Sequence, residues 1–243
     1  MIAGDQPTCF SSDVRVVVSS RSDGTMLDRT KGGMHAPNAI AHRQAFCGQV
    51  GIDYSTLAYQ IIEYGAEYTY DVIEIVGQPN PEGIYADALY TEMPGVSLFL
   101  PVADCVATVV YDTKHRALAL AHLGRHSSIA KLLPKLIDYM QARGTNPEDI
   151  VMWMAPSAHQ ESYRMEYFDQ ANDPDWQGYV DIRDEGTYLD LSGYNANLAM
   201  QAGVPQGAIS ISPVDTMRSE EYFSHAAGDT SGRFAVLAQI LKR

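Results

Sequence analysis

The sequence is poor in cysteine and in positive charge, and each shortage argues against a class of protein. Three cysteines, Cys9, Cys47 and Cys105, are too few and too irregular for a disulfide framework, and no CxxC spacing predicts a structural zinc ribbon. The 17 Lys and Arg residues against 30 Asp and Glu residues give a net charge of −13, which repels nucleic-acid phosphates and anionic lipid surfaces. We therefore expect no nucleic-acid partner and no membrane partner.

Long hydrophobic runs and targeting signals are also missing. No apolar run approaches the length of a membrane span, and the first residues have neither a basic leader nor the apolar stretch of a signal peptide. These absences predict a cytoplasmic protein. The sequence also lacks GxGxxG, other Gly-rich phosphate loops and the GxSxG elbow. Neither dinucleotide binding nor the chemistry of a serine hydrolase is therefore expected.

No low-complexity tract or long linker divides the chain, so we expect a single domain over residues 1–243. Helical patterns cover three segments, 38–50, 128–143 and 193–202, with Pro134 expected to bend the second. Short β-rich runs lie between and around them: 14–19, 72–76, 88–91, 97–101, 150–155, 209–211 and 234–241. Because strands and helices do not alternate regularly, the pattern predicts an α+β fold, a mixed-sheet α/β sandwich.

The segment from Cys105 to His122 is typical of a β-hairpin that brings a thiol and an imidazole together. Two runs rich in β-formers flank the turn Asp-Thr-Lys-His at 112–115. If the turn centres on Thr113 and Lys114, Cys105 lies directly opposite His122, close enough to share a metal ion or a proton. A register shift of one residue would send the two side chains to opposite faces, and either residue could equally be an inert packing residue.

Five short motifs carry a resemblance to a known family. In chain order they are DALYT at 87–91, PG at 94–95, ADC at 103–105, YD at 111–112 and AHLG at 121–124. Their order and spacing resemble the DALVT, PG, ADC, YD and AHAG motifs of the multicopper polyphenol oxidase or laccase-domain family, also described as purine nucleoside phosphorylase-like enzymes. The resemblance extends over nearly the whole chain, from Ser20 to Arg233.

The resemblance implies one zinc ion bound by a cysteine and two histidines. It also implies a site that cleaves purine nucleosides with phosphate and can deaminate adenosine. The family's cysteine and second histidine fall on Cys105 and His122, which are therefore expected to be catalytic and to bind the metal. Seven histidines are too few for four copper ions, despite the family's name. The expected partners are a small nucleoside and phosphate, bound by a monomer or homodimer.

This chain departs from the family at the first zinc ligand. The family motif reads QVHG, whereas residues 60–63 read QIIE, so Ile62 stands where a histidine is expected. Two protein ligands rarely retain zinc, and a replacement is needed. Glu63 is the nearest candidate, with His126 and His225 as alternatives. Glu63 could equally be a solvated surface carboxylate.

Further departures weaken the anion-binding site that the family implies. The family motif GWRG becomes GRHS at 124–127, and alanine follows His225 where the family has arginine. Arg21 and Arg125 are then the candidates to bind phosphate or a ribose-linked anion, and His126 and His225 are also expected to contact the substrate. Each arginine could equally form a surface ion pair.

Three functions stay open on these residues. The first is a divergent zinc-dependent purine nucleoside phosphorylase or adenosine deaminase-like enzyme. The second is a metal-free hydrolase or deamidase in which His122 activates the Cys105 thiol, since the fold group resembles toxin deamidases that use a Cys and a His. The third is a family member that has lost catalysis and serves as a binding module.

Overall fold

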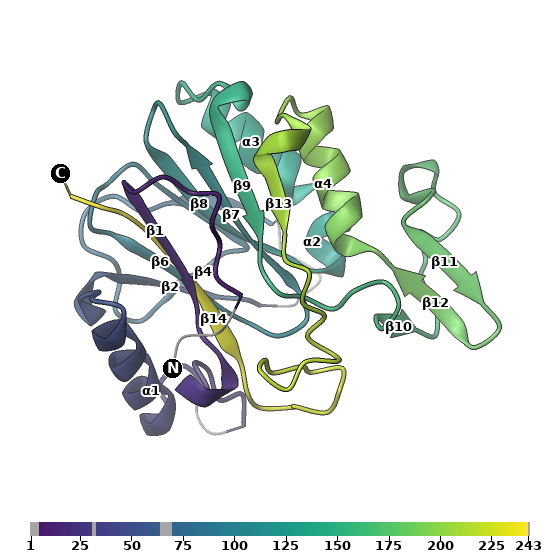
Figure 1. The fold of residues 1–243 in the computed structure, drawn as a ribbon, viewed down its shortest axis with the longest axis horizontal. Helices are drawn as coiled ribbons and strands as arrows, with labels where there is room; N and C mark the ends of the chain where they lie inside the picture. Colours follow the sequence, from purple (N-terminus) through teal and green to yellow (C-terminus); the bar gives the residue numbers. More distant parts are fainter. Residues whose placement is uncertain (1–4, 31–32, 64–69, 243) are drawn as a thin grey trace.

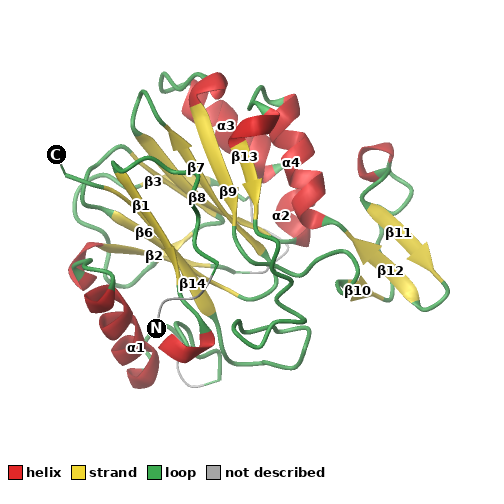
Figure 2. Ribbon diagram, viewed as in Figure 1, coloured by secondary structure: helices red, strands yellow, loops and turns green. Residues whose placement is uncertain are grey.

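The computed structural model describes residues 5–30, 33–63 and 70–242, and within them the chain forms a sandwich of four layers (Figures 1 and 2). Two mixed β-sheets pack face to face in the middle. Helix α1 (Pro37–Gln49) packs on the outer face of one sheet. Helices α2 (Arg125–Ile129), α3 (Leu132–Gln141) and α4 (Leu191–Gln201) pack on the outer face of the other. The expected α+β class is confirmed.

In the described part of the chain, the first sheet has five strands in the order β1-β14-β6-β2-β4, and the second has six in the order β13-β9-β7-β8-β5-β3. The five-stranded sheet consists of β1 (Val14–Val18), β2 (Leu57–Ile61), β4 (Ile84–Tyr85), β6 (Ser97–Val102) and β14 (Phe234–Ile240). The six-stranded sheet consists of β3 (Val72–Glu74), β5 (Ala88–Thr91), β7 (Val106–Asp112), β8 (Ala117–Leu123), β9 (Ile150–Met154) and β13 (Ile209–Ile211). Both sheets combine parallel and antiparallel pairs.

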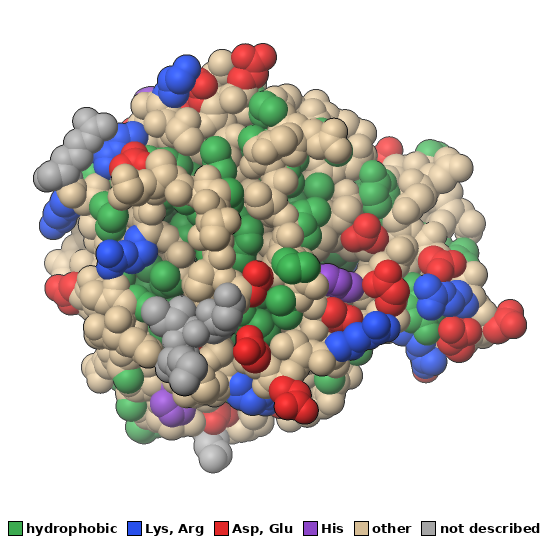
Figure 3. Space-filling view, in the orientation of Figure 1, with side chains coloured by type: hydrophobic (Ala, Val, Ile, Leu, Met, Phe, Trp, Pro, Cys, Tyr) green, Lys and Arg blue, Asp and Glu red, His purple; other side chains and the backbone are tan. Residues whose placement is uncertain are grey.

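A small third sheet projects from the side of the sandwich as an arm, at the right of Figure 1. Its strands are β10 (Arg164–Met165), β11 (Val180–Arg183) and β12 (Gly186–Leu189). Acidic and basic side chains are interspersed over the arm in Figure 3, and Arg183 donates to Asp181 at 2.7 Å. No strand of the arm is predicted from the sequence, because segments of two to four residues are too short to show a reliable hydrophobic period.

The core between the two large sheets follows from strand alternation. Ala107, Val109 and Tyr111 of β7 point into this core, whereas Val106 and Val110 point toward the helices. Side chains alternate between the two faces of a strand, so both faces of β7 must be apolar. All seven residues of β7 are buried.

Most of the expected strands are confirmed within one or two residues, but the helix expected at 128–143 is two helices. Lys131 adopts a left-handed conformation with φ 59° and separates α2 from α3. Pro134 lies in the first turn of α3, where its missing N–H costs no helical hydrogen bond. Within the described ranges, no helix is both long and apolar enough to cross a bilayer.

Short 3₁₀ helices complete the connections. They are η1 (Arg21–Asp23), η2 (Tyr54–Thr56), η3 (Pro147–Asp149), η4 (Pro174–Trp176) and η5 (Gln206–Ala208). Strands β2 and β4 are not predicted from the sequence. Strand β2 directly follows the 3₁₀ helix η2, and β4 has only two residues.

Candidate active site

Strands β7 and β8 form the expected hairpin, but the predicted register is wrong by two residues. Ala107 lies opposite His122, and the turn occupies residues 113–116, one position later than assumed. The Asp112 carboxylate fixes this turn by accepting from the backbone N–H groups of Lys114 and His115 at 2.8 and 2.9 Å. Two residues are one full period of a β-strand, so Cys105 and His122 stay on the same face.

That face is the one between the two sheets. His122 follows Leu118 and Leu120 at two-residue spacing on β8, and both leucines belong to the core between the sheets. Cys105 also packs against this core. The side chain of His122 is buried, whereas Cys105 is partly exposed. The pair therefore lies at one end of the interface between the sheets, with the sulfur accessible.

Asp104 positions Cys105 from the turn between β6 and β7. Its φ of 71° shows that the backbone departs from regular strand geometry there. The carboxylate accepts from the hydroxyl of Thr216 and from the backbone N–H of Ala226, both at 2.8 Å. Asp104 thus ties the loop between β13 and β14, which we call the C-terminal loop, to the turn that carries the cysteine.

His122 is held from behind by Asp87, a residue that sequence reasoning did not select. The two side chains meet at 2.6 Å between Nδ1 and Oδ1, and the backbone N–H of His122 donates to the Asp87 carbonyl at 2.7 Å. A carboxylate can only accept, so Nδ1 carries the hydrogen and Nε2 is left for Cys105. Asp87 is the first residue of the DALYT motif and immediately precedes β5, which pairs with β8. The contact depends on the pairing of β5 with β8, which the sequence alone does not reveal.

Cys105, His122 and Asp87 form a continuous Cys–His–Asp array. Burial opposes protonation of His122. The negative charge of Cys105 and the hydrogen bonds to Asp87 and Cys105 outweigh burial and raise the pKa of His122 to about 10. Gly124 leaves room for the array, since a Cβ there would lie 3.1 Å from Cε1 of His122 and 3.2 Å from Sγ of Cys105. The array thus places an imidazole that can exchange a proton beside the sulfur of Cys105.

A cavity of about 590 Å³ opens onto the array, within the range of pockets that bind small ligands. We call it the interface cavity, because both large sheets contribute to its wall. Besides Cys105 and His122, its lining includes Gln60, Ile62, Tyr85, Tyr163, His225 and Arg233. Burial and the negative charge of Cys105 raise the pKa of Tyr163 to about 12, so its hydroxyl is a hydrogen-bond donor at neutral pH.

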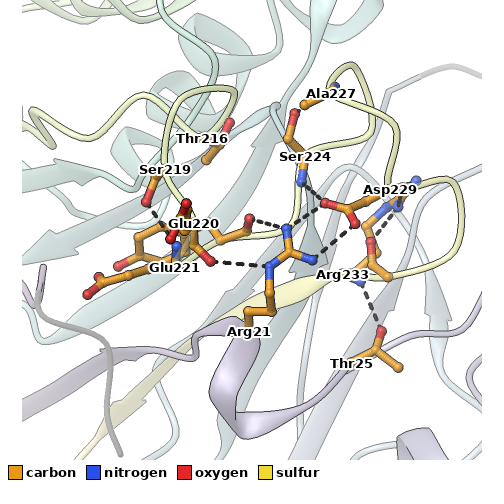
Figure 4. Close-up of polar contacts among 12 residues, drawn as sticks. Arg21, Thr25, Thr216, Ser219, Glu220, Glu221, Ser224, Ala227, Asp229 and Arg233 are labelled. Carbon is orange, nitrogen blue, oxygen red and sulfur yellow. Dashed lines mark hydrogen bonds and ion pairs between the residues drawn. The ribbon is translucent and has the colours of Figure 1, made fainter.

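Arg21 lies outside the lining of the interface cavity, in an ion pair that fastens the C-terminal loop (Figure 4). Its guanidinium donates to both carboxylate oxygens of Asp229, at 3.0 and 2.6 Å, and to the Tyr222 carbonyl at 2.8 Å. It also lies over the Phe223 ring, 4.5 Å from the centroid. The hydrogen bond from Arg21 lowers the pKa of Asp229. An ion pair, the alternative to anion binding, therefore accounts for the contacts of Arg21.

Arg125 and His126 also lie outside the lining, on the first turn of α2. Nη2 of Arg125 lies 3.1 Å from Nε2 of His126, and Nη1 lies 3.9 Å from the sulfur of Met165 on the arm. Burial and the charge of Arg125 lower the pKa of His126. Of the four residues expected to contact the substrate, His225 lines the cavity.

The donors around Cys105 and His122 do not fit a zinc site with three protein ligands. Ile62 lines the interface cavity at the position of the missing histidine, and Glu63 is exposed and does not line it. Among the residues that the structure describes, no three His, Cys, Asp or Glu side chains are grouped so as to hold a metal ion. His225 lines the same cavity without completing such a group.

Comparisons with known proteins agree with this architecture. A family model described as multi-copper polyphenol oxidoreductase laccase matches residues 35–241. A purine nucleoside phosphorylase from Bacteroides thetaiotaomicron is 34% identical over 157 residues, which are 60% of this chain and 58% of that protein. Adenosine deaminase RL5, from an unknown prokaryotic organism, is 27% identical over 140 residues, 53% of this chain and 50% of that protein. The chain thus spans between half and two thirds of these relatives.

Among solved structures, YlmD from Geobacillus stearothermophilus has the same fold. Its TM-score is 0.82 at 19% identity, and the match covers 97% of this chain and 94% of that one.

Proposed function

Because the chain belongs to the multi-copper polyphenol oxidoreductase laccase family, we propose that it is an enzyme that processes purine nucleosides in the interface cavity. The observation that carries the proposal is the Cys–His–Asp array, with its sulfur facing that cavity. The names of the relatives, purine nucleoside phosphorylase and adenosine deaminase, supply the substrate class. The volume of the cavity supports a ligand of this size.

The three residues of the array have distinct roles in this proposal. Asp87 holds the Nδ1 hydrogen of His122, which fixes the tautomer and stabilises the imidazolium. His122 exchanges a proton with the sulfur of Cys105 and with groups that leave or attack. Cys105 is the nucleophile.

Deamination of adenosine is the reaction that suits this chemistry best. The N1, C6 and amino group of adenine form an amidine, an electrophile that a thiolate can attack. The Cys105 sulfur forms a bond to C6, and the amino group leaves as ammonia after it takes a proton from His122. Water then attacks C6 and gives a proton back to His122, and the C6–S bond breaks to release inosine and the thiolate. The net reaction converts adenosine and water into inosine and ammonia.

Phosphorolysis is the second candidate, because arginine side chains line the same cavity. Arg29 and Arg233 are part of its wall, and phosphate is an anion that arginine binds well. On this alternative, phosphate would displace the purine base from the ribose. Dependence on phosphate separates the two reactions.

A zinc-dependent form of either reaction would need a third protein ligand, and the side chain of Ile62 cannot supply one. We therefore assign no step to a metal ion. On this proposal the cysteine acts as a nucleophile instead of a ligand.

Purified protein incubated with adenosine or inosine, with and without phosphate and with a chelator present, tests the proposal by chromatography of the products. We expect inosine from adenosine without phosphate, loss of activity in Cys105→Ser, and full activity in Cys9→Ser. Cys9 is a matched control because it is a partly buried thiol outside the cavity lining. Release of free purine only when phosphate is present would favour phosphorolysis. No product under any condition would contradict the proposal, and inhibition by the chelator would contradict its metal-free form.

A further inference from the structure

Gln60 faces the Cys–His–Asp array from the opposite sheet. Strand β2 alternates like the other strands: Ala58 packs in the core between the sheets, whereas Tyr59 and Ile61 pack in the cluster that includes α1 residues. Gln60 therefore points between the sheets, and it lines the interface cavity. Its side chain is 1% exposed. Cys105 and His122 belong to the six-stranded side of the same cavity.

A backbone contact fixes the orientation of the Gln60 amide. Nε2 donates to the carbonyl oxygen of Ala86 at 2.9 Å. A carbonyl can only accept, so the nitrogen must face Ala86 and the oxygen must face elsewhere. Ala86 immediately precedes Asp87, so the amide is anchored beside the residue that holds His122.

The amide oxygen of Gln60 is buried and has no hydrogen-bond partner among the described residues. A buried polar atom without a partner costs roughly 1–3 kcal/mol, and such atoms are rare in folded proteins. Gln60 lines a ligand cavity, and a bound molecule that reaches this oxygen can donate the missing hydrogen bond.

We infer that the Gln60 oxygen accepts a hydrogen bond from the exocyclic amino group of a 6-aminopurine and selects nucleosides that carry this donor. The inference rests on the proposed function, because it takes adenosine as the substrate. Gln60 is a positioning and specificity residue: it orients the amino group while Cys105 attacks the carbon that bears it.

This contact also separates substrate from product. Adenosine presents an N–H donor at position 6, whereas inosine presents a carbonyl oxygen, which is an acceptor. The Gln60 oxygen would then face another acceptor, and the backbone contact at Ala86 prevents the amide from turning to offer its nitrogen. A site built to accept a hydrogen bond rejects a ligand that lacks the donor, because its buried acceptor is then unpaired.

Calorimetric binding of adenosine and of purine riboside, which has hydrogen in place of the amino group, tests the inference. The measurement uses Cys105→Ala protein, so that adenosine is not consumed. We expect adenosine to bind about tenfold or more tightly than purine riboside, as loss of one buried hydrogen bond predicts. Adding Gln60→Met should abolish this preference, whereas Gln60→Glu, which keeps an acceptor oxygen, should retain part of it.

Gln239→Met is the matched control, since Gln239 is another buried glutamine of the five-stranded sheet, with its amide nitrogen on the Gly95 carbonyl. It should keep the full preference for adenosine. Equal affinity of the Cys105→Ala protein for the two nucleosides would overturn the inference and leave the proposed function standing. This comparison does not depend on whether Gln60→Met folds. If neither nucleoside bound, the proposed function would fail and the inference with it.

Discussion

His122 donates its Nδ1 hydrogen to the carboxylate of Asp87 at 2.6 Å, and both side chains are buried where β5 and β8 pair. A carboxylate behind a histidine is found both where the histidine binds a metal and where it acts as a base. In this chain Ile62 stands at the position of the third metal ligand. The second use therefore accounts for the arrangement better.

Asp87→Asn should lower kcat for adenosine by roughly 10²–10⁴-fold, because the amide can present its own N–H and no longer stabilises the imidazolium of His122. Steady-state kinetics and thermal unfolding measure the two effects separately. Asp112→Asn is the control, since Asp112 is equally buried and caps the turn of the same hairpin. A fall of the same size in both variants would mean that Asp87 matters only for folding.

Gly124→Ala should lower activity by roughly 100-fold, because the added methyl group meets the ring of His122 and the sulfur of Cys105 and displaces them. The backbone of Gly124 has φ −89°, so alanine is not strained there and the effect is one of space. Gly207→Ala is the control, since a Cβ at Gly207 meets no atom within 4 Å. Full activity in Gly124→Ala, measured by adenosine turnover, would show that the array tolerates displacement.

Ile62→His should create a zinc site, because Ile62 lines the interface cavity and a third ligand would join Cys105 and His122. Metal analysis after dialysis against zinc should then find about one ion per chain, and only in this variant. Ile73→His is the control, because Ile73 is an exposed isoleucine outside the cavity lining. Stoichiometric zinc in the unaltered protein would contradict the argument from the donor set.

Arg21→Gln should leave adenosine turnover nearly unchanged and lower the free energy of unfolding by about 1 kcal/mol at pH 7, since the ion pair is partly exposed and screened. The pKa of Asp229 is lowered in the folded protein. Its contribution is therefore present above the usual carboxyl pKa and is lost as the pH falls through the folded value. Denaturant titrations should thus show the gap between Arg21→Gln and the parent closing below about pH 4.

Arg183→Gln provides the comparison for Arg21→Gln, because Arg183 pairs with Asp181 on the surface of the arm. That variant should leave the unfolding free energy nearly unchanged at every pH. A large loss of turnover in Arg21→Gln would instead support the expectation that this arginine binds an anion of the substrate.

The fold was predictable from the sequence wherever a pattern reports burial. β7, β8 and β14 are continuous apolar runs and were found nearly to the residue. The break between α2 and α3 was missed because a single left-handed residue, Lys131, has no hydrophobic signature. The arm was missed for a related reason, since strands of two to four residues are too short to show a hydrophobic period.

The candidate site was predictable only in part, because proximity across a sheet depends on pairings that one sequence does not reveal. The hairpin placed Cys105 and His122 on one face even with the register in error, since the error was a full strand period. Asp87 needed the pairing of β5 with β8, and Gln60 needed the stacking of the two sheets. The role expected for His225 as a substrate contact stays a prediction, as does the oligomeric state.

The place of β14 in the five-stranded sheet affects how the chain folds during synthesis. β1 is hydrogen-bonded only to β14 in the described sheet order, although more than two hundred residues separate them along the chain. While the ribosome is still making the middle of the protein, β1 has no native neighbour and its apolar side chains lack their cover. Closing such a distant pairing is slow, and an unpaired edge can associate with other chains. Synthesis of β14, more than two hundred residues after β1, is therefore the event that ends this exposure.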